Sequence, residues 1–356
     1  MVSLLIAGGV ALIVSLVGTP LLIAWLKARG IGQQIREDGP RGHFTKAGTP
    51  TMGGLVIVAA AVLGYAAGHL RAASAGHVRV TAVFTTPGLT VIFTILGAAA
   101  VGLMDDWIKF RQRRNLGLSK RTKVMGQLIV GLGFALLATK WAHIRTDISF
   151  VRLGSSSLHL ATGLWDAFAV LVIIATTNAV NLTDGLDGLA AGSSAFAFSA
   201  LAVIAFWQFR HTSFYHVTHA ANALDLAMIA TGMVGGCAGF LWWNAPPAQI
   251  FMGDVGSLAI GGGVAALCLL SHVDLLLPII GGLFVLETLS VVVQVTSFRL
   301  FHHRRVFRMA PVHHHFELGG WPETTVLVRF WILAALCTAL AVGLFYYNFI
   351  SLNGVD

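Results

Sequence analysis

Five groups of polar and acidic residues interrupt this otherwise apolar chain, and each group contains side chains that can bind phosphate or a divalent cation. The groups span residues 37–54, 105–123, 181–188, 244–257 and 304–323, and together they hold nine of the 15 carboxylates. Carboxylates are costly beside hydrocarbon, so their concentration in these groups needs an explanation. A catalytic site is the simplest one.

The second group begins with two adjacent carboxylates, Asp105 and Asp106, followed by Lys109. They come at the end of an apolar run, and at the C-terminal end of a helix the dipole disfavours negative charge. A local ion pair with Lys109, three and four residues further on, is the structural alternative. Two neighbouring carboxylates also repel each other, which raises the pKa of one and favours a general base or a metal-binding pair.

The third and fourth groups place carboxylates just before apolar runs. Asn181, Asp184 and Asp187 are interleaved with glycines, and helix capping explains only one of the two aspartates. The spacing suits a nucleotide or magnesium site. Asp254 either caps a helix or supplies a hard oxygen ligand beside a helix N-terminus that can receive phosphate, as a magnesium diphosphate site requires.

The remaining two groups carry basic side chains. His313, His314 and His315 are consecutive, and three consecutive histidines rarely ligate one metal ion, so a zinc site is disfavoured and one histidine is expected to contact phosphate or act as acid or base. Lys46 and Thr51 precede the second apolar run and are candidates for binding a phosphate, although this first group also reads as a turn-rich loop.

The composition excludes a soluble fold. Hydrophobic residues make up 56% of the 356 residues, charged residues 11%, and the mean hydropathy is +0.79. We therefore expect an all-α polytopic membrane protein that forms a single domain over residues 1–356. Crossing a bilayer takes about 20 apolar residues, and ten runs approach that length. They span residues 2–26, 52–70, 82–104, 124–143, 162–180, 189–209, 225–243, 256–272, 275–297 and 329–350.

The basic residues predict how these spans are oriented. The side of the bundle that carries the five groups holds 17 of the 23 Lys and Arg residues, so it is expected to be cytoplasmic. Ten spans then place both termini on the periplasmic or extracytoplasmic side. The first run has no basic residues before it and no small-residue cleavage site, so we expect a true span and not a signal peptide. Residues 145–160 alternate polar and apolar side chains, which predicts a small hairpin on the outer surface.

Five segments, in this order along the chain, carry a resemblance to a known family. They are EDGPRGHFTKAGTPTMGG, DDWIK, NLTDGLDGLAAG, FMGDVGS and APVHHHFELGGWPE, which begin at residues 37, 105, 181, 251 and 310. With them the chain resembles, nearly end to end, the MraY family of phospho-N-acetylmuramoyl-pentapeptide-transferases in the polyprenyl-phosphate N-acetylhexosamine-1-phosphate transferase superfamily. The acidic elements are shared across the superfamily, whereas the first segment and the triple histidine are more particular to this family.

The resemblance implies an enzyme of the bacterial inner (plasma) membrane. It would transfer phospho-MurNAc-pentapeptide from UDP-MurNAc-pentapeptide to undecaprenyl phosphate, giving lipid I and UMP in the first membrane step of peptidoglycan synthesis. Mg²⁺ would be the cofactor and membrane lipids the surroundings. No nucleic-acid partner is expected, and a homodimer is among the oligomeric states left open.

The resemblance also implies roles for individual residues. Asp254 would ligate Mg²⁺, and Asp105, supported by Asp106, would deprotonate or align the lipid phosphate. His313 would contact the diphosphate or the sugar phosphate. The other matching positions would bind substrate: Lys46, Thr51, Lys109, Lys123, Asn181, Asp184, Asp187, Asn244, Phe251, Gln294, His314 and His315.

Two other functions remain as alternatives. A sister transferase that uses UDP-GlcNAc would keep the acidic elements. A transporter would place charges near the bilayer midplane, where only Glu287 clearly lies, either as a buried structural partner or at a lipid groove.

Direct attack is favoured over a covalent aspartyl-phosphate intermediate because the nucleophile is already a phosphate oxygen. The sequence leaves open whether the span at 275–297 is broken.

Overall fold

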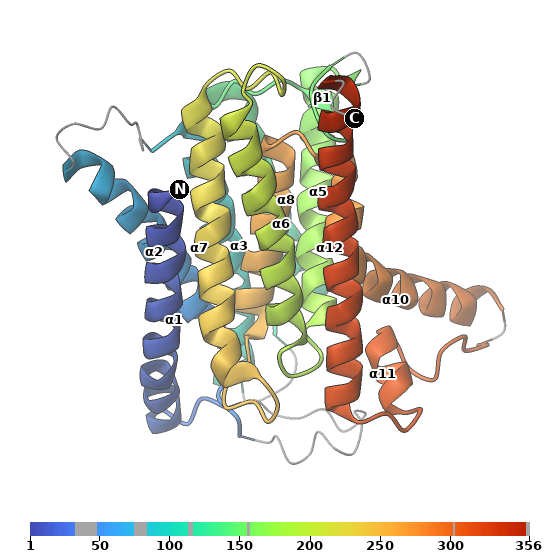
Figure 1. Ribbon diagram of the computed structural model, residues 1–356. Helices are drawn as coiled ribbons and strands as arrows, with labels where there is room; N and C mark the ends of the chain where they lie inside the picture. The colour runs from blue at the N-terminus through green and yellow to red at the C-terminus, as the bar shows by residue number, and fades with distance from the viewer. Residues whose placement is uncertain (33–47, 75–83, 113–116, 155–156, 302, 354–356) are drawn as a thin grey trace.

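The computed structural model describes residues 1–32, 48–74, 84–112, 117–154, 157–301 and 303–353, and it is a bundle of long helices (Figure 1). The α-helices are α1 Val2–Ala28, α2 Gly54–Ser74, α3 Thr86–Arg111, α4 Lys120–Leu136, α5 Thr162–Thr183, α6 Leu189–Arg210, α7 Ala220–Asn244, α8 Gly253–Leu270, α9 Leu277–Ile280, α10 Gly282–Leu300, α11 Val312–Glu317 and α12 Glu323–Asn353. A π-helical turn, η2 Leu137–Trp141, extends α4, and a 3₁₀ turn, η3 Asp274–Leu276, precedes α9.

The all-helical prediction is confirmed. Within the described part of the chain, nine helices are long and apolar enough to cross a membrane: α1, α3, α4 with η2, α5, α6, α7, α8, α10 and α12. The expected run at 52–70 corresponds to α2, whose apolar stretch Gly54–Leu70 is shorter than the others. The tenth span therefore stays a prediction.

The expected hairpin is also confirmed. Strands β1 Asp147–Ile148 and β2 Leu158–His159 pair antiparallel, with Asp147 opposite His159. The hairpin is tied to the loop after α8, because the Ser149 N–H donates to Asp274 Oδ2 at 3.1 Å. Figure 1 shows β1 at one end of the bundle, with the start of α1 and the end of α12 in the same upper half of the view.

Helix α8 forms the centre of the bundle. It packs against α3 and α5, and 89% of the residues in its apolar stretch, Gly253–Leu270, are buried. At one turn α8 and α3 touch backbone to backbone, because a Cβ added to Gly102 would lie 2.2 Å from the carbonyl oxygen of Asp254. This contact holds the C-terminal end of α3 and the N-terminal end of α8 at a fixed spacing.

The span expected at 275–297 is broken. Helix α9 ends at Ile280, and after Gly281 α10 leaves the bundle sideways, at a steep angle to α12 (Figure 1). Pro278 lies in the first turn of α9, and the Gly281–Gly282 pair follows it. Proline and paired glycines are the usual sites at which a helix bends sharply, because they weaken the hydrogen-bond ladder.

Candidate active site

Three carboxylates meet where the end of α3 reaches the start of α8. They belong to Asp105, Asp106 and Asp254, and one oxygen of each lies within 4.8 Å of the other two. Asp105 and Asp106 are each only 3% exposed. The structure thus brings together the acids that the sequence placed in two separate groups. Grouped oxygen donors of this kind are the ligands that Mg²⁺ and Ca²⁺ prefer.

Backbone groups fix the orientation of the two α3 acids. Asp105 Oδ1 accepts the Leu118 N–H at 2.8 Å, and Asp106 Oδ2 accepts the Val255 N–H at 3.1 Å. Gly253 starts α8 with φ +73, and a Cβ there would lie 2.5 Å from Asp106 Oδ2. Glycine is therefore required at this position on two counts, conformation and space. The N-terminal end of α8 also offers a positive dipole end to the carboxylates.

Two lysines neutralise part of this charge. The Lys109 ammonium lies 2.6 Å from Asp105, 3.4 Å from Asp106 and 3.0 Å from Asp254. Lys123, from α4, lies 2.8 Å from Asp254 Oδ2. The local ion pair considered as the structural alternative is present, but Lys109 reaches a carboxylate on another helix too. It belongs to a site built by three helices and not to a pairing within α3.

Asn181 adds a fourth helix, α5, to the cluster. Its Nδ2 donates to Asp254 Oδ1 at 2.8 Å and to Ser257 Oγ at 2.9 Å, and its Oδ1 accepts from Lys123 Nζ at 3.2 Å. Every oxygen of Asp254 is thereby held by a donor. Ser257 was given no role from the sequence, although its position three residues after Asp254 on a helix puts both on one face.

Asp184 follows α5 directly, at the edge of the same cluster. Burial, and next the negative charges of Asp254 and Asp106, raise the pKa of Asp184 to about 8. At Asp184, the negative charges of Asp254 and Asp106 outweigh the opposing effect of Lys109. A cation bound among the carboxylates would make the electrostatic potential there less negative. Both this charge balance and the hard oxygen donors fit a magnesium ion.

His313 approaches this cluster from α11. Its side chain is fully buried, with Nδ1 3.1 Å from Glu287 Oε2 on α10. Gly185 lies against the other side of the ring, because an added Cβ would be 2.3 Å from Nε2. Gly185 directly follows Asp184, so this contact joins the histidine to the acids. Of the two roles considered for Glu287, the structure shows the buried partner.

Asn244 and Asp187 hydrogen-bond to the loops around the cluster. Asn244 Oδ1 accepts the Gly188 N–H at 3.0 Å, and its Nδ2 donates to the Ile250 carbonyl at 2.8 Å. Asp187 Oδ2 accepts the Ala248 N–H at 3.0 Å. These bonds tie the loop before α6, which carries Asp184 and Asp187, to the loop that leads into Asp254 at the start of α8.

Thr51 and Phe251 are brought together by backbone pairing. The Phe251 N–H donates to the Pro50 carbonyl at 2.8 Å, and the Gly53 N–H donates to the Phe251 carbonyl at 2.9 Å. Thr51 Oγ1 would lie 3.1 Å from a Cβ on Gly253, beside the start of α8. Lys46, with the rest of 37–47, lies outside the described residues.

Three predicted substrate ligands make local contacts on α10 and α11. The Gln294 amide donates to one backbone carbonyl and accepts two backbone N–H groups of residues 306–307, at 2.9 to 3.1 Å. His314 Nδ1 lies 2.7 Å from Glu317, and His315 Nδ1 accepts a backbone N–H of the same loop at 3.1 Å. Their contact with substrate stays a prediction.

The family comparisons agree with this geometry. The glycosyl transferase family 4 profile matches residues 88–272, and phospho-N-acetylmuramoyl-pentapeptide-transferase signature 1 matches residues 46–58. A relative from Frankia casuarinae is 50% identical over 364 residues, covering 99% of each chain. One from Streptomyces coelicolor is 47% identical over 362 residues, covering 97% of this chain and 98% of its own. Both relatives are named phospho-N-acetylmuramoyl-pentapeptide-transferase, and with this similarity over the whole length the chain belongs to that family of membrane transferases, within glycosyl transferase family 4.

Proposed function

We propose that this chain transfers phospho-MurNAc-pentapeptide from UDP-MurNAc-pentapeptide to undecaprenyl phosphate, forming lipid I and releasing UMP in a Mg²⁺-dependent reaction. The observation that carries the proposal is the cluster of three carboxylates and two lysines at the helix ends. Phosphoryl transfer depends on positioning and on neutralising charge more than on covalent catalysis. A cluster at the end of the bundle allows a lipid phosphate and a soluble nucleotide to meet.

Each acid has a role that its contacts support. Asp105 has one oxygen fixed by a backbone N–H and the other by Lys109, so its orientation is set before substrate arrives. It would align the lipid phosphate and accept its proton, with Asp106 beside it. Lys109 and Lys123 are within reach of the same acids and would shift to phosphate oxygens when substrate binds.

Asp254 would hold the magnesium ion. Its carboxylate lies at the start of α8, within 4.8 Å of Asp105 and Asp106. When bound, the ion would neutralise charge on the diphosphate. Asn181, which donates to Asp254, would orient that carboxylate, and His313 would contact the diphosphate or the sugar phosphate from the opposite side.

The membrane arrangement is part of the proposal. We place the cluster on the cytoplasmic face of the bacterial inner membrane, both termini on the other face, and α2 as the tenth span. The excess of Lys and Arg near the cluster supports this orientation. Leu289, Val292 and Val293 on α10 are exposed and offer apolar surface for the undecaprenyl chain. The homodimer stays a prediction that neither the described residues nor the relatives' names address.

A radiolabelled lipid I assay on the purified chain tests the proposal. Label from UDP-MurNAc-pentapeptide should pass to undecaprenyl phosphate with Mg²⁺ and not after chelation. UDP-GlcNAc, offered in parallel, should give no lipid product; transfer from UDP-GlcNAc alone would assign the chain to the sister activity instead. Uptake of the nucleotide sugar into vesicles without UMP release would point to a transporter.

Two further measurements test the mechanism. Asp105→Asn should abolish exchange of UMP with the UDP substrate, and normal exchange would exclude an essential base or nucleophile at that position. Inversion of configuration at phosphorus would support direct attack. Retention would support an aspartyl-phosphate intermediate.

A further inference from the structure

A cavity of about 300 Å³ lies at the end of the bundle opposite the carboxylates. Thr86, at the start of α3, lines it, whereas Asp105 lies near the other end of the same helix, about 28 Å away at 1.5 Å per residue. The cavity therefore does not belong to the transferase site. Its volume is at the small end of the range for ligand sites, about 300–1,000 Å³.

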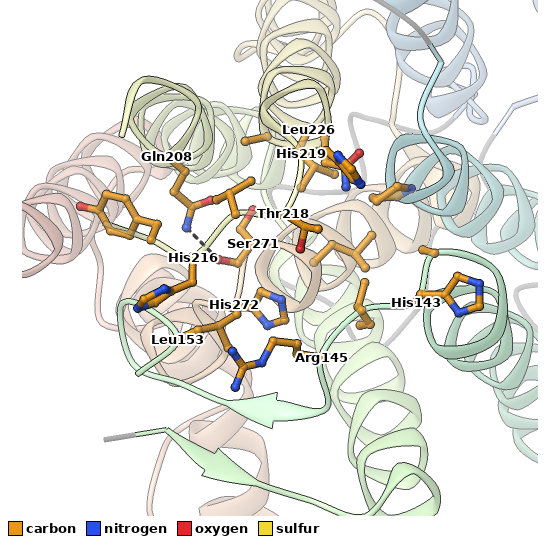
Figure 2. A pocket seen from close by; sticks show the side chains of 18 of the residues that line it. His143, Arg145, Leu153, Gln208, His216, Thr218, His219, Leu226, Ser271 and His272 are labelled. Atoms are coloured by element: carbon orange, nitrogen blue, oxygen red, sulfur yellow. Dashed lines mark hydrogen bonds between the residues drawn. The ribbon is translucent and has the colours of Figure 1, made fainter. Parts of the chain in front are cut away.

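Two arginines and four histidines line this cavity, and burial lowers the pKa of one of them, His272, to about 4, which keeps that imidazole neutral. Arg145, Arg152, His143, His216, His219 and His272 line it, and none of the described lining residues carries a carboxylate. Figure 2 labels five of these side chains, all except Arg152, and they come from several segments, with His219 at the start of α7 and His272 after α8. A concave surface with this composition attracts an anion.

In the described part of the chain, Arg152 has no carboxylate partner. Its guanidinium stacks over the Phe214 ring, 4.5 Å from the centroid, and lies 3.5 Å from the Phe214 carbonyl oxygen. No carboxylate of the described residues lies within 4.0 Å of it. Arg145 differs, because its Nε lies 2.9 Å from Asp147, which His159 also contacts. A ligand anion would therefore give Arg152 an acidic partner that the described residues do not supply.

Two further groups offer donors to such an anion. His219, the N-cap residue of α7, lines the cavity together with Asn222 of the first turn, so the positive dipole end of α7 lies at the cavity wall. The buried Nδ1 of His272 has no hydrogen-bond partner among the described residues. Gln208, in the wall, is fixed by a 2.8 Å hydrogen bond from its Nε2 to the Ser271 carbonyl (Figure 2).

We propose that this cavity binds a phosphate group, with Arg152 and Arg145 as its cationic ligands and the start of α7 as a further donor. Trp141, which lines the cavity, is 46% exposed. Exposed tryptophan is typical of the level of lipid head groups. The phosphate of an anionic lipid head group and free inorganic phosphate share this chemistry.

Binding to the full-length chain in neutral detergent separates the two sources. One arm adds short-chain phosphatidylglycerol. The other arm adds sodium phosphate, with sodium chloride of equal ionic strength as its control. In each arm the Kd is obtained from the shift of the thermal unfolding midpoint with ligand concentration. A shift with the lipid alone assigns the site to a head group, and a shift in both arms to phosphate in general. No shift in either arm overturns the proposal.

Variants locate the binding. Arg152→Gln should weaken it about tenfold or more, because a charge-assisted contact is lost. Arg145→Gln, at a side chain that is 59% exposed, provides a second test. Arg210→Gln, at an exposed arginine on the same end but outside the cavity, is the control and should leave the Kd unchanged. Equal affinity in wild type and in both cavity variants places the anion elsewhere and overturns the proposal. Lipid I formation should be unchanged in all three variants.

Discussion

Gly185→Ala tests whether the position of His313 controls turnover. A Cβ on residue 185 would lie 2.3 Å from His313 Nε2, whereas ordinary contacts begin at 3.4 Å. The imidazole must therefore move by about 1.1 Å, and its other nitrogen already faces Glu287 in a fully buried position. A misplacement of ~1 Å in a catalytic constellation costs about 10²-fold in rate.

The expected result is a kcat for lipid I formation about 100-fold below wild type. Overpacking of this kind also costs ~1–3 kcal/mol of stability, so the thermal midpoint should fall without loss of the fold. Gly163→Ala is the matched control, because it lies at the other end of α5, where an added Cβ meets nothing within 4 Å. Its kcat should equal that of wild type.

A double-mutant cycle with His313→Ala identifies the cause. If the methyl group acts through the imidazole, adding Gly185→Ala to His313→Ala should change kcat no further. A wild-type kcat for Gly185→Ala would refute the reasoning. A fully additive loss in the double variant would do the same, because it would place the effect outside the histidine.

Three other changes have expected outcomes. Asn244→Ala leaves the Gly188 N–H and the Ile250 carbonyl without their buried partner, at ~1–3 kcal/mol each, so the thermal midpoint should fall clearly; an unchanged midpoint would show that the loops do not need this bridge. Burial raises the pKa of Asp274 to about 7, so the folded state disfavours its ionised form, and the stability loss grows as pH rises from about 4 through 7. Asp274→Asn should therefore stabilise the protein at pH 8, by at most ~4 kcal/mol for the three-unit shift in pKa. In thermal melts this gain should shrink toward pH 4. A gain that is constant with pH would contradict the reasoning. Lys109→Gln removes a cation that contacts all three carboxylates. Calorimetry should therefore show Mn²⁺ binding at least about tenfold tighter, while turnover is lost. Weaker Mn²⁺ binding would exclude competition between the lysine and the metal.

The sequence was sufficient to predict the acids of the site because charge in an apolar chain is conspicuous. Asp105, Asp106, Asn181 and Asp254 stand out individually, and the alternation of spans puts all of them at one end of the bundle. The resemblance then added Lys109 and Lys123 as substrate ligands. The distances between these side chains could not be predicted from the sequence. A local Asp105–Lys109 ion pair and a site shared by four helices have the same sequence pattern.

Other features left weaker signals. Gly185 leaves room for the His313 ring, because any larger side chain at residue 185 would overlap it. This steric role cannot be recognised from the pattern of residue types. The turn of α10 out of the bundle had a local cause in Pro278 and the following glycines, but its direction depends on the packing of α9 and α10 against α12. The basic cavity is assembled from segments far apart in the chain, each of which carries only one or two charges.

The contact between Gly102 and the Asp254 carbonyl bears on how resistance to an inhibitor could arise. The spacing of the acids is set by two helix backbones in direct contact, so side-chain substitutions have little means of altering it and keeping the bundle intact. A compound that binds the carboxylates through their spacing would leave the chain few escape routes at that point. Escape mutations should instead gather at positions away from this backbone contact.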